Sequence, residues 1–251
     1  MGRRARKRHI QQAIRFRDKN GQLRGGKRPG AGRPKQGPRA SERHEKRPQL
    51  ASRFPVHGIL RVEKDVGSLR QPHIYHAIRE ALEVVKARSD FRVVEISLQR
   101  NHVHLVVEAA NAIALARGMQ SLQISAARKV NAAISKHRNR ERTGRVFVDR
   151  YHARILRTPR DVRHVLNYVL NNWRHHGEDK GFESVNWDVD WFSSAPRFAG
   201  WKEPAPTMPS RYHPLGTCAA ETWLLRVGWT RGGPPISMYA VPGSDCYEGR
   251  V

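Results

Sequence analysis

Hydrophobic positions between residues 54 and 173 repeat with two different periods, in segments that alternate along the chain. Alternation at every second residue predicts four strands, at Phe54–Val62, Phe91–Leu98, Asn101–Glu108 and Arg145–Leu156. Apolar positions three and four residues apart predict helices at Gln71–Arg88, from about Ile113 to His137, and after Thr158. Only Gln99-Arg100 separates the middle two strands, which predicts a hairpin. This order of elements indicates an α+β fold, in which helices pack on one antiparallel sheet.

The third predicted helix has a well-marked start. Thr158 can cap it, Pro159 suits its first turn, and Asp161 stands at capping-box spacing from Thr158. Its apolar stripe consists of Val162, Val165, Leu166, Val169 and Trp173. We therefore expect an amphipathic helix with one face against the sheet.

The two ends of the chain lack such patterns. Residues 1–47 are rich in Gly, Pro and Arg and poor in large apolar groups, which predicts a flexible basic arm. Residues 177–251 are rich in Trp and Pro and have few clean periods, which predicts irregular structure packed on the core. We therefore expect three parts, at 1–47, 48–176 and 177–251.

Charge points to a polyanionic partner. The chain has 47 Lys and Arg against 22 Asp and Glu, a formal net charge of +25, and nucleic acid is the simplest partner for such an excess. Within the arm, Gly32-Arg33-Pro34-Lys35 resembles the core of an AT-hook, which lays Arg into the minor groove. A merely cationic arm explains Arg33 and Lys35 equally well.

Composition also excludes several classes of protein. No apolar run reaches the length of about 18 residues that a membrane span needs. The segment that starts at Met1 lacks the apolar core of a signal peptide. Two cysteines cannot build a disulfide framework or a Cys-rich zinc site. We expect an intracellular protein without a membrane partner.

Two histidines form the sharpest local feature. His102 and His104 lie two apart in a predicted strand, so they share a face, while Val103, Leu105 and Val107 face the core. Imidazoles at this spacing lie roughly 6–7 Å apart along the strand, close enough to share a metal ion. Glu108 is on the same face but about 13 Å from His104, too far to join them. Two solvent-facing histidines are the alternative.

The second feature lies on the last helix. Tyr168 and Asn172 are one helical turn apart and share a face on the flank of the apolar stripe. A phenol is almost wholly protonated at neutral pH and is a weak nucleophile unless its target is activated. A metal on the histidine pair could activate a phosphodiester, and Asn172 could add an amide-oxygen ligand. An ordinary boundary tyrosine is the alternative.

These two features carry a family resemblance. Residues 101–108, NHVHLVVE, resemble the His-hydrophobic-His (HUH) motif of single-strand DNA endonucleases, and residues 150–177 resemble the tyrosine-helix region of single-tyrosine transposases. The chain is most similar to the REP-associated tyrosine transposases, over about residues 45–176. The resemblance implies a sheet-and-helix sandwich, a nucleophilic Tyr168, Mg²⁺ or Mn²⁺ on His102 and His104, and completion of the site by Asn172.

The resemblance also implies a substrate and a setting. It points to a bacterial, cytoplasmic, DNA-associated transposase or endonuclease that acts on single-stranded, hairpin-forming repeats through a phosphotyrosine intermediate. Many family members have an N-P-V-R-A-G-like ending after the tyrosine, whereas residues 172–177 read NWRHHG. This departure concerns substrate contacts after the helix more than the chemistry. The choice between a monomer and a homodimer is open.

Further cations could contact the DNA backbone. They are Arg128 and Lys129 on the long helix, and Arg150, His152 and Arg154 on one face of the last predicted strand. Four other histidines, at 57, 164, 175 and 176, have no partner in the sequence and are interpreted as surface or boundary residues. A relaxase-like or replication-initiator nicking enzyme is one rival hypothesis, and a non-catalytic DNA- or RNA-binding protein is another.

Overall fold

The computed structural model describes residue 19 and residues 48–243. The chain divides into two units, Met1–Ser41 and Glu42–Val251. In the first unit only Lys19 is described, as an exposed turn residue. The predicted arm therefore lies almost wholly outside the described residues, and Arg33 and Lys35 lie outside them as well. All described helices and strands belong to the second unit.

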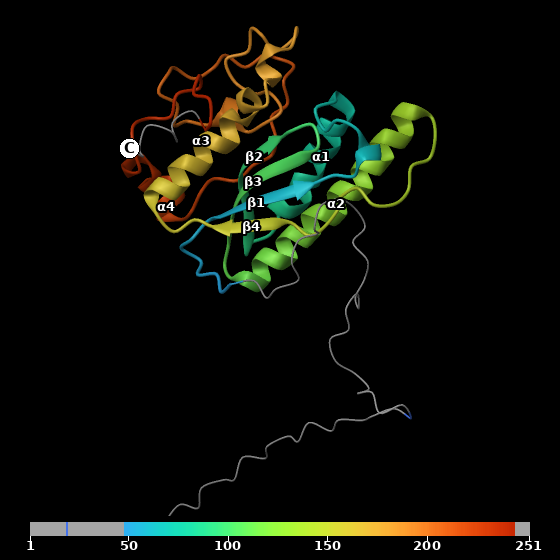
Figure 1. The fold of residues 1–251 in the computed structure, drawn as a ribbon, viewed down its shortest axis with the longest axis horizontal. Helices are drawn as coiled ribbons and strands as arrows, with labels where there is room; N and C mark the ends of the chain where they lie inside the picture. Colours follow the sequence, from blue (N-terminus) through green and yellow to red (C-terminus); the bar gives the residue numbers. More distant parts are fainter. Residues whose placement is uncertain (1–18, 20–47, 244–251) are drawn as a thin grey trace, which may run out of the picture. The chain divides into compact units, whose positions relative to one another are not determined.

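A four-stranded antiparallel sheet forms the centre of the second unit (Figure 1). Its strands are β1 (Val56–Arg61), β2 (Phe91–Leu98), β3 (His102–Ala109) and β4 (His152–Ile155). They lie in the order β2-β3-β1-β4, and each pair of neighbours is antiparallel. The predicted α+β class and the predicted hairpin are confirmed.

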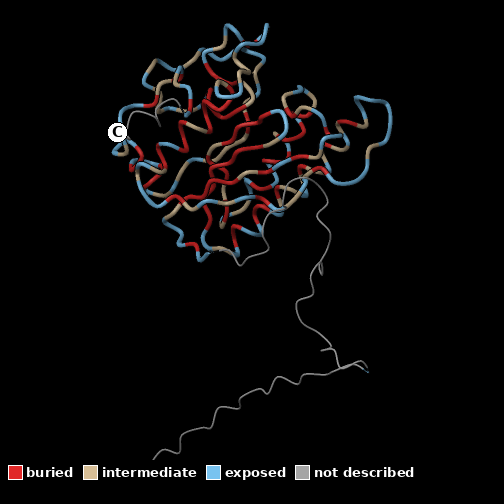
Figure 2. Tube along the Cα trace, viewed as in Figure 1, coloured by how far each residue is buried: buried red, intermediate tan, exposed pale blue. Residues whose placement is uncertain are grey.

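Three helices cover the two faces of this sheet. They are α1 (Pro72–Lys86), α2 (Ala112–Arg138) and α3 (Pro159–His175). Helices α1 and α2 share the main core with one face, to which Val103, Leu105 and Val107 belong. Helix α3 packs on the other face, where Val106 belongs to a second core. Both faces are therefore buried along most of the sheet (Figure 2).

The start of α3 agrees with its sequence signals. The Thr158 hydroxyl accepts a hydrogen bond from the Asp161 backbone N–H at 3.1 Å and donates one to the Asp161 carboxylate at 2.9 Å. Pro159 occupies the first turn, where its missing N–H costs nothing. Local capping chemistry therefore sets where the helix that carries Tyr168 begins.

The fourth strand is much shorter than predicted. The ladder between β1 and β4 pairs Ile59 with His152, yet the next bridge pairs Val62 with Phe147. Between these two pairings lie two residues, Leu60 and Arg61, on one side and four residues, 148–151, on the other, and the excess must loop out of the ladder. The prediction of one continuous strand that places Arg150 beside His152 and Arg154 is therefore wrong, because Arg150 lies in that loop.

Residues 177–243 cover the open edge of β2. The Leu98 N–H donates to the Phe192 carbonyl at 2.9 Å, and the Ser194 N–H donates to the Ile96 carbonyl at 2.8 Å. An edge strand without such a cover invites pairing with other chains. The segment otherwise contains only short helical turns: η2 (Glu178–Lys180), η3 (Ala195–Arg197), α4 (Trp223–Arg226) and η4 (Gly228–Arg231), while η1 (Lys64–Val66) precedes α1.

Among the described residues, no helix combines the length and the apolar character that crossing a membrane would require.

Candidate active site

The histidine pair lies on the sheet face that α3 covers. His102 and His104 are on β3, where His104 pairs with Ile59 of β1 on one side and Ser97 of β2 on the other. The common face of the two side chains is as predicted. The two side chains lie opposite the core residues Val103, Leu105 and Val107, as predicted, but His104 is nevertheless buried, with an exposed fraction of 2%. That face is not open to solvent, because α3 packs over it.

The two imidazoles point their Nε2 atoms at each other, at a distance of 2.9 Å. Nδ1 of His102 lies 2.7 Å from the Asn101 side-chain oxygen, which can only accept, so this Nδ1 carries the proton. Nδ1 of His104 lies 3.1 Å from Nε2 of His57. If this Nδ1 donates to His57, both facing Nε2 atoms present lone pairs at one point, as a shared metal ion requires.

His57 is a site residue that the sequence analysis missed. It lies on β1, is only 7% exposed, and stacks its ring on His104 at a centroid distance of 5.3 Å. It faces Val106 directly across the sheet, so His104 is its diagonal neighbour on the same face. Nothing in the sequence around residue 57 signals this contact, because it depends on which strands are neighbours.

Burial keeps these histidines neutral. Desolvation, followed by the nearby His152 and Arg154, lowers the pKa of His57 to about 4. Desolvation, followed by His176 and Arg61, lowers the pKa of His102 to about 4. The pKa of His104 falls to about 2, again mainly through desolvation. All three rings are therefore uncharged at neutral pH, the form in which imidazole binds metals.

Helix α3 places Tyr168 directly against this pair. The Tyr168 ring lies edge-on to His104 at a centroid distance of 5.1 Å and to His57 at 6.1 Å. At the end of the helix, the ring centroid of the exposed His176 lies 5.5 Å from that of His102. The ring centroid of His175 lies 6.3 Å from that of Tyr168. One chain therefore brings together the predicted nucleophile and the predicted metal ligands. His175 and His176, interpreted above as ordinary, border the same site.

Three buried amide side chains, those of Gln99, Asn171 and Asn172, lack hydrogen-bond partners for their oxygens among the described residues. Asn172, one turn after Tyr168, is 0% exposed, and neither its oxygen nor its nitrogen has a hydrogen-bond partner among the described residues. Gln99 is 1% exposed, and its nitrogen donates to the Ser97 hydroxyl while its oxygen has no partner there. Gln99 lies opposite His102 across the hairpin turn. Buried polar atoms without partners call for an unseen ion or water.

The groups here that could bind a metal are the imidazoles of His102 and His104 and an amide oxygen. No group of three or more His, Cys, Asp and Glu side chains within the described residues could hold a metal ion. Glu108 is excluded, as predicted, because its carboxylate accepts hydrogen bonds from the backbone N–H groups of Glu221 and Thr222. Asn172, whose side-chain oxygen is unpaired, stays the predicted third ligand.

The predicted DNA contacts divide between the two sides of the sheet. His152 and Arg154 lie on β4 opposite Ile59 and His57, on the face that carries the histidine pair. Arg154 also forms an ion pair with Asp161 at 2.8 Å. Arg128 and Lys129 belong to α2, which packs on the opposite face, and Lys129 pairs with Glu80 at 2.8 Å. The structure thus does not bring these two residues to the site.

Acid is expected to destabilise the metal-free protein. The pKa values of His57 and His102 are about 4 in the folded chain against an ordinary 6.5, so the unfolded chain binds protons first as the pH falls. The free energy of unfolding should decrease from pH 6.5 towards pH 4. Glu95 and Asp190 act in the opposite sense, because desolvation raises the pKa of both carboxyl groups, to about 7 for Glu95, but three histidines outweigh two carboxyl groups.

This pH dependence can be measured by urea unfolding in EDTA at pH 7.5 and pH 5. A His57→Gln variant should lose less stability between the two pH values than the parent, because it removes one of the depressed imidazoles. Equal losses in the parent and the variant would contradict the argument.

Comparison with known proteins identifies a family model and solved structures that this chain matches. A family model described as "Transposase IS200 like" matches residues 51–172. No curated protein matches the chain. A solved structure titled as a REP-associated tyrosine transposase bound to a REP hairpin is 15% identical, with a TM-score of 0.50; the match covers 72% of this chain and 100% of that one. At this identity the likeness establishes a common fold.

Two further solved structures are less similar. They are bacterial tRNA(His) guanylyltransferase-like proteins in complex with GTP and with ATP, at 14% and 12% identity. Both have a TM-score of 0.39, and each match covers 57% of this chain and 71% or 72% of the other. This level of likeness carries no argument about function.

Proposed function

Because residues 51–172 form a domain of the IS200-like transposase family, we propose that the protein is a metal-dependent single-strand DNA endonuclease and strand transferase. One observation carries the proposal. Tyr168 packs on His104, whose Nε2 atom faces that of His102 at 2.9 Å. A non-catalytic nucleic-acid-binding protein needs the positive charge of this chain but not a phenol placed beside two neutral, converging imidazoles.

The proposed reaction is a transesterification at phosphorus. The Tyr168 oxygen forms a bond to the phosphorus of a DNA phosphodiester, and the bond from phosphorus to one deoxyribose oxygen breaks. The phenolic proton leaves as the phosphotyrosyl ester forms, and the released sugar oxygen takes up a proton. One phosphodiester replaces another of similar energy, so the reverse reaction can join strands without ATP.

The chain's own residues supply binding and orientation. His102, His104 and Asn172 would hold Mg²⁺ or Mn²⁺, which would polarise the scissile phosphate and offset its charge. Asn101 and His57 hold the ligand rings through their Nδ1 atoms, as partners of metal-bound histidines commonly do. His152 and Arg154 lie on the same sheet face, where they could contact the backbone of the bound strand.

The proposed substrate is single-stranded DNA next to a hairpin. The solved structure of the REP-associated tyrosine transposase contains such a hairpin, and the present chain has its fold. The test is incubation of the full chain with a labelled hairpin oligonucleotide that carries single-stranded flanks, in Mn²⁺ and in EDTA. A denaturing gel should show a covalent protein–DNA species in Mn²⁺ only. Its absence under both conditions would refute the proposal.

Asn172→Ala should weaken the reaction less than loss of either histidine. An amide oxygen is a weaker ligand for a transition metal than imidazole, and water can replace it. The Mn²⁺ concentration for half-maximal cleavage should rise by roughly tenfold, which corresponds to about 1.4 kcal/mol of binding free energy, while the adduct stays on Tyr168. A metal titration of cleavage measures the effect.

Asn171→Ala is the matched control for this experiment. The Asn171 side-chain nitrogen donates hydrogen bonds to Asn167 at 2.9 Å and to the Ser237 carbonyl at 3.0 Å. Its oxygen, like that of Asn172, has no partner among the described residues, so this variant removes a comparable buried amide whose nitrogen is engaged elsewhere. Its metal titration should match that of the parent. Coincident curves for Asn172→Ala and the parent would remove Asn172 from the ligand set.

A further inference from the structure

One aromatic side chain in the segment that follows α3 is almost fully exposed. Phe182 follows α3 and η2 and is 98% exposed, more than any other large hydrophobic residue in the described part of the chain. An exposed phenylalanine on an otherwise ordered segment gains nothing from burial in its own fold. Its position, six residues after His176, raises the question of what it contacts.

A hydrogen-bonded turn holds the Phe182 side chain in solvent. The backbone N–H groups of Ser184 and Val185 both donate to the Gly181 carbonyl, at 3.1 Å and 2.9 Å. The Ser184 hydroxyl is buried and donates to the Glu178 carbonyl. The turn therefore closes on η2, and the ring at its tip is presented in a defined place.

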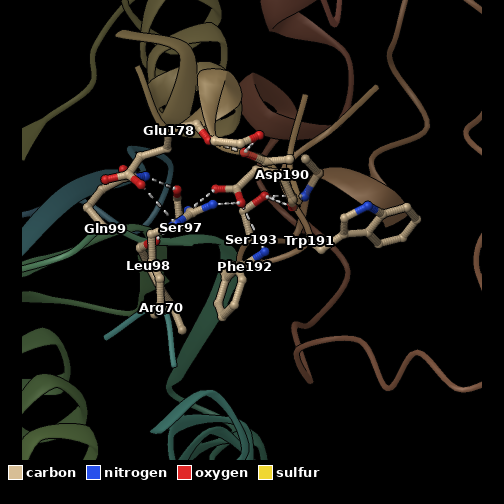
Figure 3. A network of polar contacts seen from close by, with 12 residues as sticks. Arg70, Ser97, Leu98, Gln99, Glu178, Asp190, Trp191, Phe192 and Ser193 are labelled. Carbon is tan, nitrogen blue, oxygen red and sulfur yellow. Dashed lines mark hydrogen bonds and ion pairs between the residues drawn. The ribbon is translucent and has the colours of Figure 1, made fainter. Parts of the chain in front are cut away.

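The same turn is tied to the hairpin that carries His102. The Glu178 carboxylate lies 2.6 Å from the Arg100 guanidinium and 3.8 Å from that of Arg70. Arg70 in turn forms a two-pronged ion pair with the buried Asp190, with both contacts at 2.9 Å, and donates to the Leu98 carbonyl at the end of β2 (Figure 3). A buried, bidentate ion pair of this kind fixes the relative positions of the two segments that it joins.

This network gives Phe182 a fixed relation to the candidate site. Arg100 stands two residues before His102, and Glu178 stands two residues after His176, whose ring lies 5.5 Å from His102. The ion pair between Arg100 and Glu178 therefore joins the tip of the hairpin between β2 and β3 to the segment that follows α3. The turn with Phe182 extends from that junction.

We propose that Phe182 is a base-stacking residue that binds an unpaired nucleobase of the DNA strand next to the cleavage site. A flat, exposed ring stacks on any base, because every base has a π face. This inference rests on the proposed function, since it takes single-stranded DNA as the ligand and deepens the account of how that ligand is held.

The surroundings of Phe182 favour a base over a protein surface. Its neighbours Lys180 and Glu183 are exposed and opposite in charge, and Val185 is the one other exposed apolar residue between 178 and 186. A protein interface needs a contiguous apolar patch, whereas one base needs one ring. Arg100, 74% exposed beside the turn, can contact the adjoining phosphate.

The test compares two strands with the same backbone. The full chain is titrated in EDTA with dT20 and with a 20-unit abasic strand, at a salt concentration that limits binding through charge alone. The parent should bind dT20 more tightly. Phe182→Ala should weaken binding to dT20 by roughly 5- to 150-fold, the range for loss of one stacked base, and leave binding to the abasic strand unchanged.

Two variants complete the design. Phe182→Trp should keep the preference for dT20, because it keeps an aromatic face, and Val185→Ala should behave like the parent, because it removes an exposed aliphatic group from the same turn. Folding is not at risk in any of these, since nothing packs on either side chain to a large extent.

Three results would overturn the inference: equal binding of dT20 by Phe182→Ala and the parent, equal binding of the two strands by the parent, or an equal loss on both strands in Phe182→Ala. The covalent-adduct assay decides the proposed function separately. If the parent forms the adduct while Phe182→Ala binds dT20 as tightly as the parent, the stacking role of Phe182 is refuted and the proposed function is not. A parent that stacks dT20 through Phe182 without forming an adduct refutes the endonuclease alone.

Discussion

Tyr168→Phe is expected to abolish the covalent protein–DNA species while leaving the fold and DNA binding nearly intact. Phenylalanine keeps the ring that packs edge-on against His104 and His57 and removes only the proposed nucleophilic oxygen. No other group of the site can form a phosphotyrosyl bond, so the expected loss is complete within detection. The measurement is a denaturing gel of labelled hairpin DNA in Mn²⁺, together with a binding assay in EDTA.

Tyr239→Phe provides the matched control. Tyr239 is an exposed tyrosine of the C-terminal segment whose hydroxyl donates to Asp188 at 3.0 Å, so loss of its oxygen should leave the adduct unchanged. A covalent species that persists in Tyr168→Phe at the parent's level would show that the nucleophile is another residue.

His104→Ala should have the second largest effect, and it should act on two properties. Loss of one of the two proposed imidazole ligands would remove the activation of the phosphate, which is worth several kcal/mol, so cleavage should fall by at least about 100-fold. Because His104 is buried beneath α3 and contacts His57, the variant should also lose about 1–3 kcal/mol of unfolding free energy.

His102→Ala separates these two effects. His102 is only partly buried, so this variant should lose cleavage to a similar degree with a smaller loss of stability. Mn²⁺ binding measured by calorimetry and unfolding measured in urea distinguish the two properties. Unchanged cleavage in both variants, or cleavage by the parent in EDTA, would exclude metal binding by the histidine pair from the mechanism.

Local patterns were sufficient for most of the secondary structure. A period of two residues or 3.6 residues reports which side of a segment is apolar, and capping at Thr158 is a contact between near neighbours in sequence. For the same reason the sequence shows that His102 and His104 share a face of β3 and that Tyr168 and Asn172 share a face of α3.

The limits of these patterns are equally physical. The short β4 arises from the mismatch between the pairings of Ile59 with His152 and Val62 with Phe147, and the register between strands far apart in sequence leaves no local trace. The C-terminal segment lacks periodicity because it follows the edge of β2 through backbone hydrogen bonds, and these do not depend on a repeating side-chain pattern.

The amino-acid sequence by itself therefore determined the residue types and the faces on which they lie. Only the tertiary structure decided that α3 lies over the histidine face, so that Tyr168 meets His104 and His104 is buried. It also decided that β1 is the neighbour of β3, which brings His57 to His104. Side-chain periodicity depends on one segment at a time, whereas a site assembled from three segments depends on how their apolar faces pack together.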